Sequence, residues 1–265
     1  MRIVSICPSN TEIACVLGLE SALVGLDRSS DYPESVNALP RVGPDLTVDI
    51  GAIQALKPDL VLSSLSVPGM EHNLAGLDAA GIPHLVMDAE SIAGVFQSIR
   101  VLGRLTGRGS LADLVVEGMQ ARLNAARSRA PGVRPKVFLE WWPKPVIVPG
   151  RRCWTTEMIT IAGGDSLFAE LDVRSTPVHN HEVPPRAPDL LLTCWCGVPH
   201  ERQVPQKMAE REGWQDIPGV RSGQLHAAPE RYFGRPGPRL VDGVEWLQER
   251  VLAWAAVQSP SPNMG

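Results

Sequence analysis

The 265-residue chain is poor in aromatic residues, which make up 5% of it, and it lacks the signatures of several functional classes. Its five cysteines are an odd number and give no simple disulfide framework. No apolar run reaches the length of a membrane span. The net charge of −4 predicts no basic surface for nucleic acid. Walker loops, nucleophile elbows, HExxH sequences and dinucleotide-binding glycine motifs are all absent, so we expect no enzyme of those kinds.

Two further features bear on the class and the compartment. Hydrophobic residues make up 44% and charged residues 20% of the chain, which is typical of a globular protein with a core. No signal peptide or lipobox precedes the strand that begins at Arg2. We therefore expect a cytoplasmic protein if Met1 is the native start, and otherwise a periplasmic or extracytoplasmic protein whose signal was removed.

Short β-rich runs alternate with helical segments along the whole chain. Strands are predicted over residues 2–7, 24–27, 60–63, 84–87, 136–140, 190–193 and 224–227. Helices are predicted between them, with clear amphipathic patterns at 92–105 and 240–256. This alternation predicts an α/β fold of βαβ units with mostly parallel sheets.

A long amphipathic helix is predicted over residues 110–130, between two similar halves. Ser110 and Asp113 resemble a capping box at its start, and Pro131-Gly132 ends it. Such a helix is about 30 Å long and connects domains stiffly. We therefore predict an N-terminal α/β lobe over 1–109, a linker helix over 110–131 and a C-terminal α/β lobe over 132–265, with a ligand cleft between the lobes.

An internal repeat supports two Rossmann-like lobes of common design. Residues 11–26 match residues 156–171 at one constant offset, and residues 57–64 match residues 187–194. In each copy a glutamate follows the repeated aspartate by twelve positions, which pairs Glu71 with Glu201. Both glutamates lie near predicted helix starts, where a carboxylate is stabilised. Their equivalent positions indicate a partner that contacts both lobes.

The few aromatic residues are concentrated on loops that follow strands of the second lobe. Parallel α/β sheets bind ligands at the carboxyl ends of their strands, and aromatic rings there favour a large flat ligand. In the first lobe the same edge offers Ser9 and the aromatic Tyr32. The predicted ligand-binding residues are Ser9, Tyr32, Trp141, Trp142, Trp154, Trp195, Tyr232, Phe233 and Arg235.

Two short pairs are the only metal-ligand candidates that the pattern suggests. His179 and His181 lie in a proline-rich loop, and Cys194 and Cys196 follow a predicted strand. Neither pair has the usual context of a metal site, so we predict no bound metal and structural roles for the cysteines.

The order and spacing of several motifs resemble the helix-backbone class of ABC-importer substrate-binding proteins, and within it the cobalamin-binding proteins. The motifs are Pro8-Ser9-Asn10-Thr11-Glu12, Ser30-Asp31-Tyr32-Pro33, Leu56-Lys57-Pro58-Asp59-Leu60-Val61, Phe138-Leu139-Glu140, Ala162-Gly163-Gly164 and Arg235-Pro236-Gly237-Pro238-Arg239. The resemblance implies non-catalytic, non-covalent binding of cobalamin or a related corrinoid. It also implies that Arg235 contacts the corrinoid and that Glu71 and Glu201 dock on an ABC permease.

Two alternatives remain open at this stage. The same fold could bind haem, a ferric chelate or a metal ion, with His179, His181, Cys194 and Cys196 as candidates. A cytoplasmic enzyme or sensor could also use the scaffold, since fold does not determine function. For that reading the sequence nominates Glu140, Cys194 and Cys196, with no convincing catalytic pair.

Overall fold

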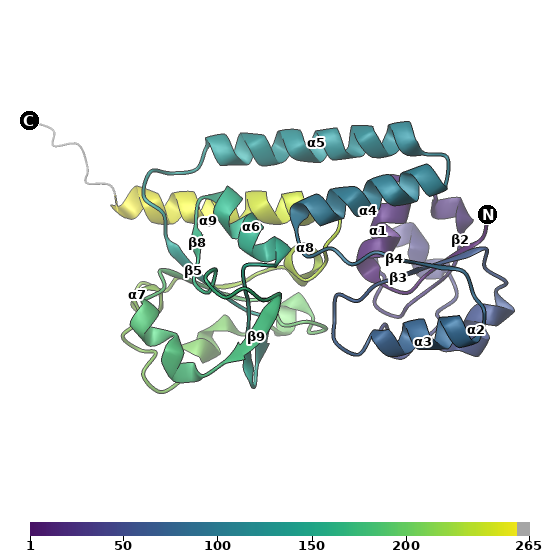
Figure 1. The fold of residues 1–265 in the computed structure, drawn as a ribbon. Helices are drawn as coiled ribbons and strands as arrows, with labels where there is room; N and C mark the ends of the chain where they lie inside the picture. The colour runs from purple at the N-terminus through teal and green to yellow at the C-terminus, as the bar shows by residue number, and fades with distance from the viewer. Residues whose placement is uncertain (259–265) are drawn as a thin grey trace, which may run out of the picture. The chain divides into compact units, whose positions relative to one another are not determined.

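A computed structural model describes residues 1–258 of the chain (Figure 1). The predicted C-terminal tail, 259–265, lies outside the described residues. Two compact units share the described residues: unit 1 comprises Met1–Gly118 and Pro236–Pro238, and unit 2 comprises Met119–Arg235 and the described residues from Arg239 onward. The division therefore falls inside a helix, and a short return segment near the C-terminus also belongs to unit 1.

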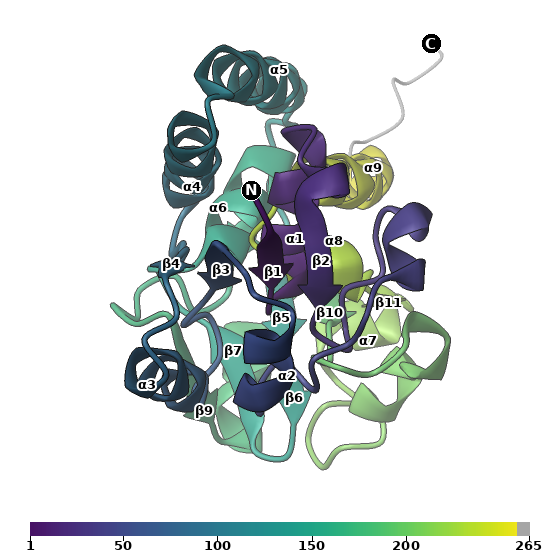
Figure 2. The same cartoon turned by 90° about the vertical axis from the view of Figure 1, so that its right-hand side faces the viewer.

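Unit 1 is built on a parallel four-stranded sheet of order β2-β1-β3-β4 (Figure 2). Its strands are β1 (Ile3–Ser5), β2 (Leu23–Leu26), β3 (Leu60–Ser63) and β4 (His84–Val86). Its helices are α1 (Pro8–Val16), α2 (Ile50–Ala55), α3 (Glu71–Ala79) and α4 (Ile92–Leu105). Local chemistry explains the helix starts: Pro8 is preset for a first helical turn, while Asp49 and Ser91 accept backbone N–H groups of α2 and α4.

Unit 2 combines a parallel sheet of order β11-β10-β5-β8 with an antiparallel sheet of order β6-β7-β9. Its strands are β5 (Lys136–Glu140), β6 (Trp142–Pro143), β7 (Val146–Pro149), β8 (Asp165–Ser166), β9 (Ser175–Val178), β10 (Leu190–Thr193) and β11 (Leu225–Ala227). Its helices are α6 (Trp154–Ala162), α7 (Pro218–Arg221), α8 (Glu230–Phe233) and α9 (Leu240–Gln258). The antiparallel sheet is an addition that the sequence patterns did not predict.

The two parallel sheets have the same strand order when β8, β5, β10 and β11 are matched to β2, β1, β3 and β4. The repeated aspartates have one role in both: Asp59 accepts the backbone N–H of Arg2 at 2.6 Å, and Asp189 accepts that of Lys136 at 2.8 Å. The residue before each repeated proline has a left-handed backbone, with φ of 48° at Lys57 and 49° at Ala187. The repeated sequence therefore forms the same local structure at the start of β3 and at the start of β10.

Helix α5 (Gly109–Ser128) runs through the point where the units divide, after Gly118. Its predicted start was wrong by one residue, because the carbonyl of Arg108 already accepts the N–H of Ala112 at 2.9 Å. Ser110 is thus inside the helix, and Asp113 pairs with Arg100 of α4 at 2.8 Å instead of capping α5.

Each unit has its own apolar core. Unit 1 buries Val4, Ile6, Ile53, Val61 and Leu77 between its sheet and helices. Unit 2 buries Phe138, Phe168 and Trp214, whose rings meet edge to face. Among residues 1–258, no helix is both long and apolar enough to cross a membrane.

Candidate ligand-binding site

Polar side chains of unit 1 gather where β1 and β3 end and α1 begins. Ser9 is buried in the first turn of α1, and its Oγ lies 3.2 Å from the Cys7 Sγ. Asn10 donates its side-chain amide to the carbonyl of Ser63 at 2.9 Å. These contacts fix the first turn of α1 to the carboxyl end of β3.

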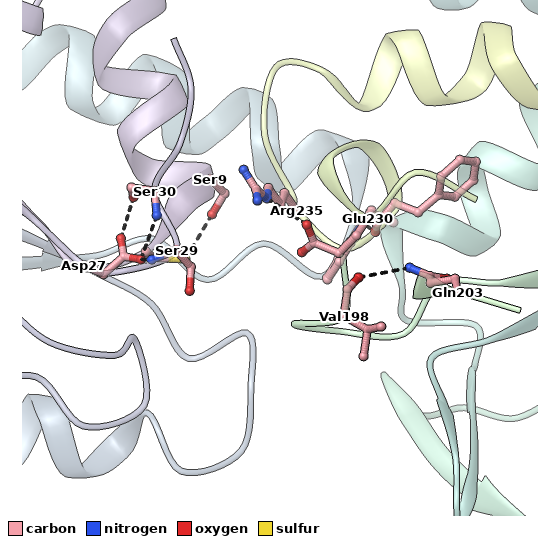
Figure 3. A network of polar contacts seen from close by, with 11 residues as sticks. Ser9, Asp27, Ser29, Ser30, Val198, Gln203, Glu230 and Arg235 are labelled. Atoms are coloured by element: carbon pink, nitrogen blue, oxygen red, sulfur yellow. Dashed lines mark hydrogen bonds and ion pairs between the residues drawn. The ribbon is translucent and has the colours of Figure 1, made fainter. Parts of the chain in front are cut away.

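Asp27, which follows β2, organises the neighbouring loop and was missed by sequence reasoning. One of its oxygens accepts the N–H groups of Ser29 and Ser30 at 2.7 and 3.0 Å, and the other accepts the Ser30 hydroxyl at 2.5 Å (Figure 3). Burial raises the Asp27 pKa to about 6, although these hydrogen bonds act in the opposite direction. This loop also carries Tyr32, whose side chain is 45% exposed.

In unit 2 the matching edge holds a buried ion pair. Glu140, the last residue of β5, is fully buried and accepts two hydrogen bonds from Arg211, at 2.5 and 2.9 Å. The same carboxylate accepts the indole N–H of Trp195 at 2.9 Å. Gln203 accepts the backbone N–H of Trp195 at 3.2 Å and donates to the carbonyl of Val198 (Figure 3). Trp195, on the loop after β10, is therefore held at two points.

The structure separates the aromatic residues predicted to bind ligand into two sets. Trp154 and Phe233 are buried: the Trp154 indole donates to the Phe233 carbonyl at 2.8 Å, and the Phe233 ring packs on Trp246. Trp141 is 9% exposed, with its ring centroid 5.5 Å from that of Trp154. We assign these three side chains to packing inside unit 2.

The second set remains accessible. Trp142 is 40% exposed, and its indole donates to the carbonyl of Lys144 at 3.1 Å. Trp195 and Tyr232 are partly exposed. The Tyr232 ring lies 4.9 Å from the guanidinium carbon of Arg231 and 5.9 Å from that of Arg239.

Two buried polar atoms at this edge of unit 2, the Trp141 Nε1 and the Thr193 Oγ1, have no hydrogen-bond partner among residues 1–258. They belong to the ends of adjacent strands, because Thr193 is in register with Glu140. Arg235 is buried and donates to Glu230 at 3.1 Å (Figure 3). Unpaired buried groups are uncommon in proteins.

The four metal-ligand candidates are not brought together. Within residues 1–258, no group of three or more His, Cys, Asp or Glu side chains is placed to hold a metal ion. The rings of His179 and His181 stack on each other at 5.4 Å in a loop after β9. Cys194 is buried and Cys196 is exposed. Burial raises the pKa of the Cys194 thiol well above its usual range, so it is not a thiolate at neutral pH.

The two glutamates predicted to dock on a permease are both exposed. Glu71 is the first residue of α3 and accepts the N–H of Gly69 at 2.8 Å, and backbone N–H groups lower its pKa. Glu201 lies in a short 3₁₀ turn, His200–Arg202, instead of a long helix. Each follows a matching strand, β3 or β10, of its own unit.

The model of the family described as periplasmic binding protein matches residues 3–232, and the chain belongs to this family. It is 30% identical to an uncharacterized ABC transporter substrate-binding lipoprotein of Bacillus subtilis (strain 168), over 94% of this chain and 79% of the relative. The chain is thus a substrate-binding protein of the ABC-importer type, and the resemblance inferred from its motifs is confirmed.

Solved structures also confirm the two-lobed α/β fold with parallel sheets. The periplasmic vitamin B12 binding protein of Vibrio cholerae has a TM-score of 0.77 and 25% identity, covering 96% of this chain and 97% of that one. The periplasmic haem-binding protein of Roseiflexus sp. RS-1 has a TM-score of 0.83 and 27% identity, covering 96% and 98%. The two neighbours bind different ligands on the same fold.

Proposed function

We propose that this protein binds cobalamin or a related corrinoid without a covalent bond and delivers it to an ABC permease outside the cytoplasmic membrane. The observation that carries the proposal is the pair of accessible tryptophans, Trp142 and Trp195. Trp142 is the first residue of β6, just after β5, and Trp195 lies on the loop after β10. A corrinoid is a large ring system whose edge carries methyl groups as well as amides, so aromatic side chains can supply much of its contact area. The likeness to a vitamin B12 binding protein supports the same ligand.

The polar contacts are proposed on the same edges. Ser9, in the first turn of α1, is proposed to present its hydroxyl to ligand amides. Arg235, oriented by Glu230, is the proposed hydrogen-bond donor to an amide or phosphate of the corrinoid. Tyr32 and Tyr232 complete the proposed aromatic set. The division into a first lobe over 1–109 and a second lobe over 132–265 stays a proposal, with the linker helix observed as α5 (Gly109–Ser128) in place of the predicted 110–131.

The proposed role is non-catalytic. Glu140, the main carboxylate nominated for an enzyme, has both oxygens engaged by Arg211 and one also by Trp195. A general base must lie within hydrogen-bond reach of its substrate, whereas Glu140 is fully buried. The charge of Glu140 is instead balanced within the protein, which supports a structural role at a binding surface.

Haem is the second candidate ligand, because the haem-binding neighbour is as similar to this chain as the vitamin B12 binding neighbour. Tyrosine is one of the residues that ligate haem iron, and Tyr32 is the exposed tyrosine of unit 1. His179 and His181 are weaker candidates, since their rings stack on each other.

A calorimetric titration with cyanocobalamin tests the proposal, with a parallel hemin titration followed by its visible absorbance. We expect one-to-one cyanocobalamin binding at micromolar affinity or tighter. W142A and W195A should each weaken it about tenfold or more, as central aromatic contacts do. W246A, which removes an aromatic ring packed on Phe233, is the control for lost stability. If cyanocobalamin gives no heat and hemin gives a saturable absorbance change, haem replaces the corrinoid as the proposed ligand.

A further inference from the structure

The buried ion pair of unit 2 connects the core of the unit to an accessible tryptophan. Glu140 offers one carboxylate to three donors, the two guanidinium N–H groups of Arg211 and the indole N–H of Trp195. These partners come from 71 and 55 positions further along the chain. A charge this deeply buried is stable only when it is paired and hydrogen-bonded.

Arg211 is itself held in place from its other side. Its guanidinium carbon lies 4.6 Å from the centroid of the Trp214 ring, and the Trp214 indole donates to the carbonyl of Asn180 at 3.0 Å. Trp214 belongs to the fully buried core of unit 2. The chain of contacts therefore runs from the core through Arg211 and Glu140 to the indole of Trp195.

Trp195 receives a second restraint at its backbone. The side-chain oxygen of Gln203 accepts its N–H at 3.2 Å, and Gln203 is buried. A tryptophan side chain has only two torsions. A fixed backbone and a fixed Nε1 position therefore leave one orientation for the indole ring. The ring nevertheless remains partly exposed.

We propose that Glu140, oriented by Arg211, is a positioning residue that holds the indole of Trp195 rigid for stacking against the ligand. The assignment rests on the proposed function of the site. A ring that is ordered before binding loses little conformational freedom when the ligand arrives. One ordered side chain changes affinity by roughly two- to tenfold, so this is the size of effect that the pair should have.

The test is the E140Q variant, compared with wild type by cyanocobalamin calorimetry and by hydrogen exchange of the tryptophan indole N–H groups. A glutamine has one acceptor oxygen and cannot serve three donors. We expect binding to weaken by about three- to tenfold and the Trp195 indole N–H, assigned with W195F, to exchange faster in the free protein. The Trp142 indole, which bonds to Lys144, should be unaffected.

D165N is a control for charge removal elsewhere in unit 2, because Asp165 is also a carboxylate bound by an arginine, Arg134, although its side chain is more exposed than that of Glu140. It should change neither the cyanocobalamin affinity nor the exchange of the Trp195 indole. If E140Q does not fold, Q203A removes the backbone restraint without leaving a buried charge unpaired, and the same weakening is expected.

The outcomes separate the two proposals. If the wild-type protein binds cyanocobalamin and both E140Q and Q203A bind it with the same affinity, the positioning role is overturned and the corrinoid proposal stands. Unchanged exchange of the Trp195 indole in E140Q would also overturn it. Wild-type protein that binds no cyanocobalamin would overturn the proposed function, and the positioning role with it.

Discussion

Asp27 makes a defined contribution to the pH dependence of stability. Its pKa is raised from 3.8 to about 6 by burial, so the native state holds this proton more tightly than the unfolded state. The contribution is therefore fully present below the unfolded pKa, and it is lost as pH rises through the native pKa of about 6. Two pKa units correspond to about 3 kcal/mol, which is an upper limit for this group.

We expect the free energy of unfolding of D27N to depend less on pH than that of wild type between about pH 4 and pH 7. The substituted amide keeps an acceptor oxygen for the N–H groups of Ser29 and Ser30 and carries no charge. Urea unfolding at several pH values gives the free energy of unfolding of both proteins. In the difference between these two free energies, the contributions of other carboxylates such as Glu71 cancel. A difference that does not change with pH would contradict the prediction.

At the scale of the helix, Gly118 is a weak point of α5. It is exposed in the middle of the helix, and a Cβ added there would meet no atom within 4 Å. A helical glycine costs about 0.5–1 kcal/mol relative to alanine, mainly because the unfolded chain is more flexible. We expect G118A to raise the free energy of unfolding by about that amount, measured by thermal and urea unfolding.

Gly163, the residue at the C-terminal end of α6, is a control for which the same substitution should be destabilising. Its φ is 98°, and an added Cβ would lie 2.6 Å from the Pro131 Cδ. G163A should therefore lower the free energy of unfolding, by about 1 kcal/mol or more. If G118A and G163A changed the free energy of unfolding equally, the local backbone conformation would not determine whether a glycine-to-alanine substitution stabilises the protein.

The C-terminal half of α5 is held to α9 by Arg122, which bonds to Asp242 at 2.6 Å and to Glu245 at 2.7 and 2.9 Å. Hydrogen bonding to Arg122 lowers the Glu245 pKa, so this contribution is present above the unfolded pKa and is lost as pH falls. The side chains are partly exposed, and we expect R122A to cost about 1 kcal/mol or less. The loss should shrink in high salt, as urea unfolding in about 1 M NaCl would show.

Elements with strong local patterns could be predicted from the sequence. The predicted bounds of β3, β5, β10 and α4 agree with the structure, because buried runs and amphipathic periods are local signals. The antiparallel sheet was missed because β7 pairs with the distant strand β9 and because its one local partner, β6, is very short. Val146 pairs with Val178, and β6 is only two residues long.

The candidate site shows the same limit. Its loops could be placed at the carboxyl ends of the strands, but burial within those loops could not. Trp154 and Phe233 look like Trp142 in the sequence, yet Trp154 bonds to the Phe233 backbone and the Phe233 ring packs against α9. Arg211 gave no signal, since its partner Glu140 is 71 positions away.

At the scale of the whole molecule, the internal repeat explains why two exposed glutamates have equivalent places. Glu71 follows β3 and Glu201 follows the matching strand β10. Each lies the same number of residues after the repeated aspartate of its own unit. Neither contributes to a core, so selection for stability does not account for the match. A partner with two similar contact sites, as the proposed permease docking requires, would account for it.

We therefore expect the double variant E71A/E201A to bind cyanocobalamin with wild-type affinity and to lose its interaction with the permease. The measurement is stimulation of ATP hydrolysis by the reconstituted permease, titrated with each protein. Charge complementarity contributes mainly to association, so the loss should be partial in each single variant. It should also shrink at high salt, because salt screens the wild-type attraction as well.

E117A, which removes an exposed carboxylate from α5, is the control for this pair and should stimulate the permease as wild type does. Full stimulation by E71A/E201A would place the docking surface elsewhere on the molecule. Weakened cyanocobalamin binding by the same variant would instead make Glu71 and Glu201 part of the ligand site. Loss of stimulation with intact ligand binding is the one result that separates docking from binding, because the two functions then depend on different residues of the same chain.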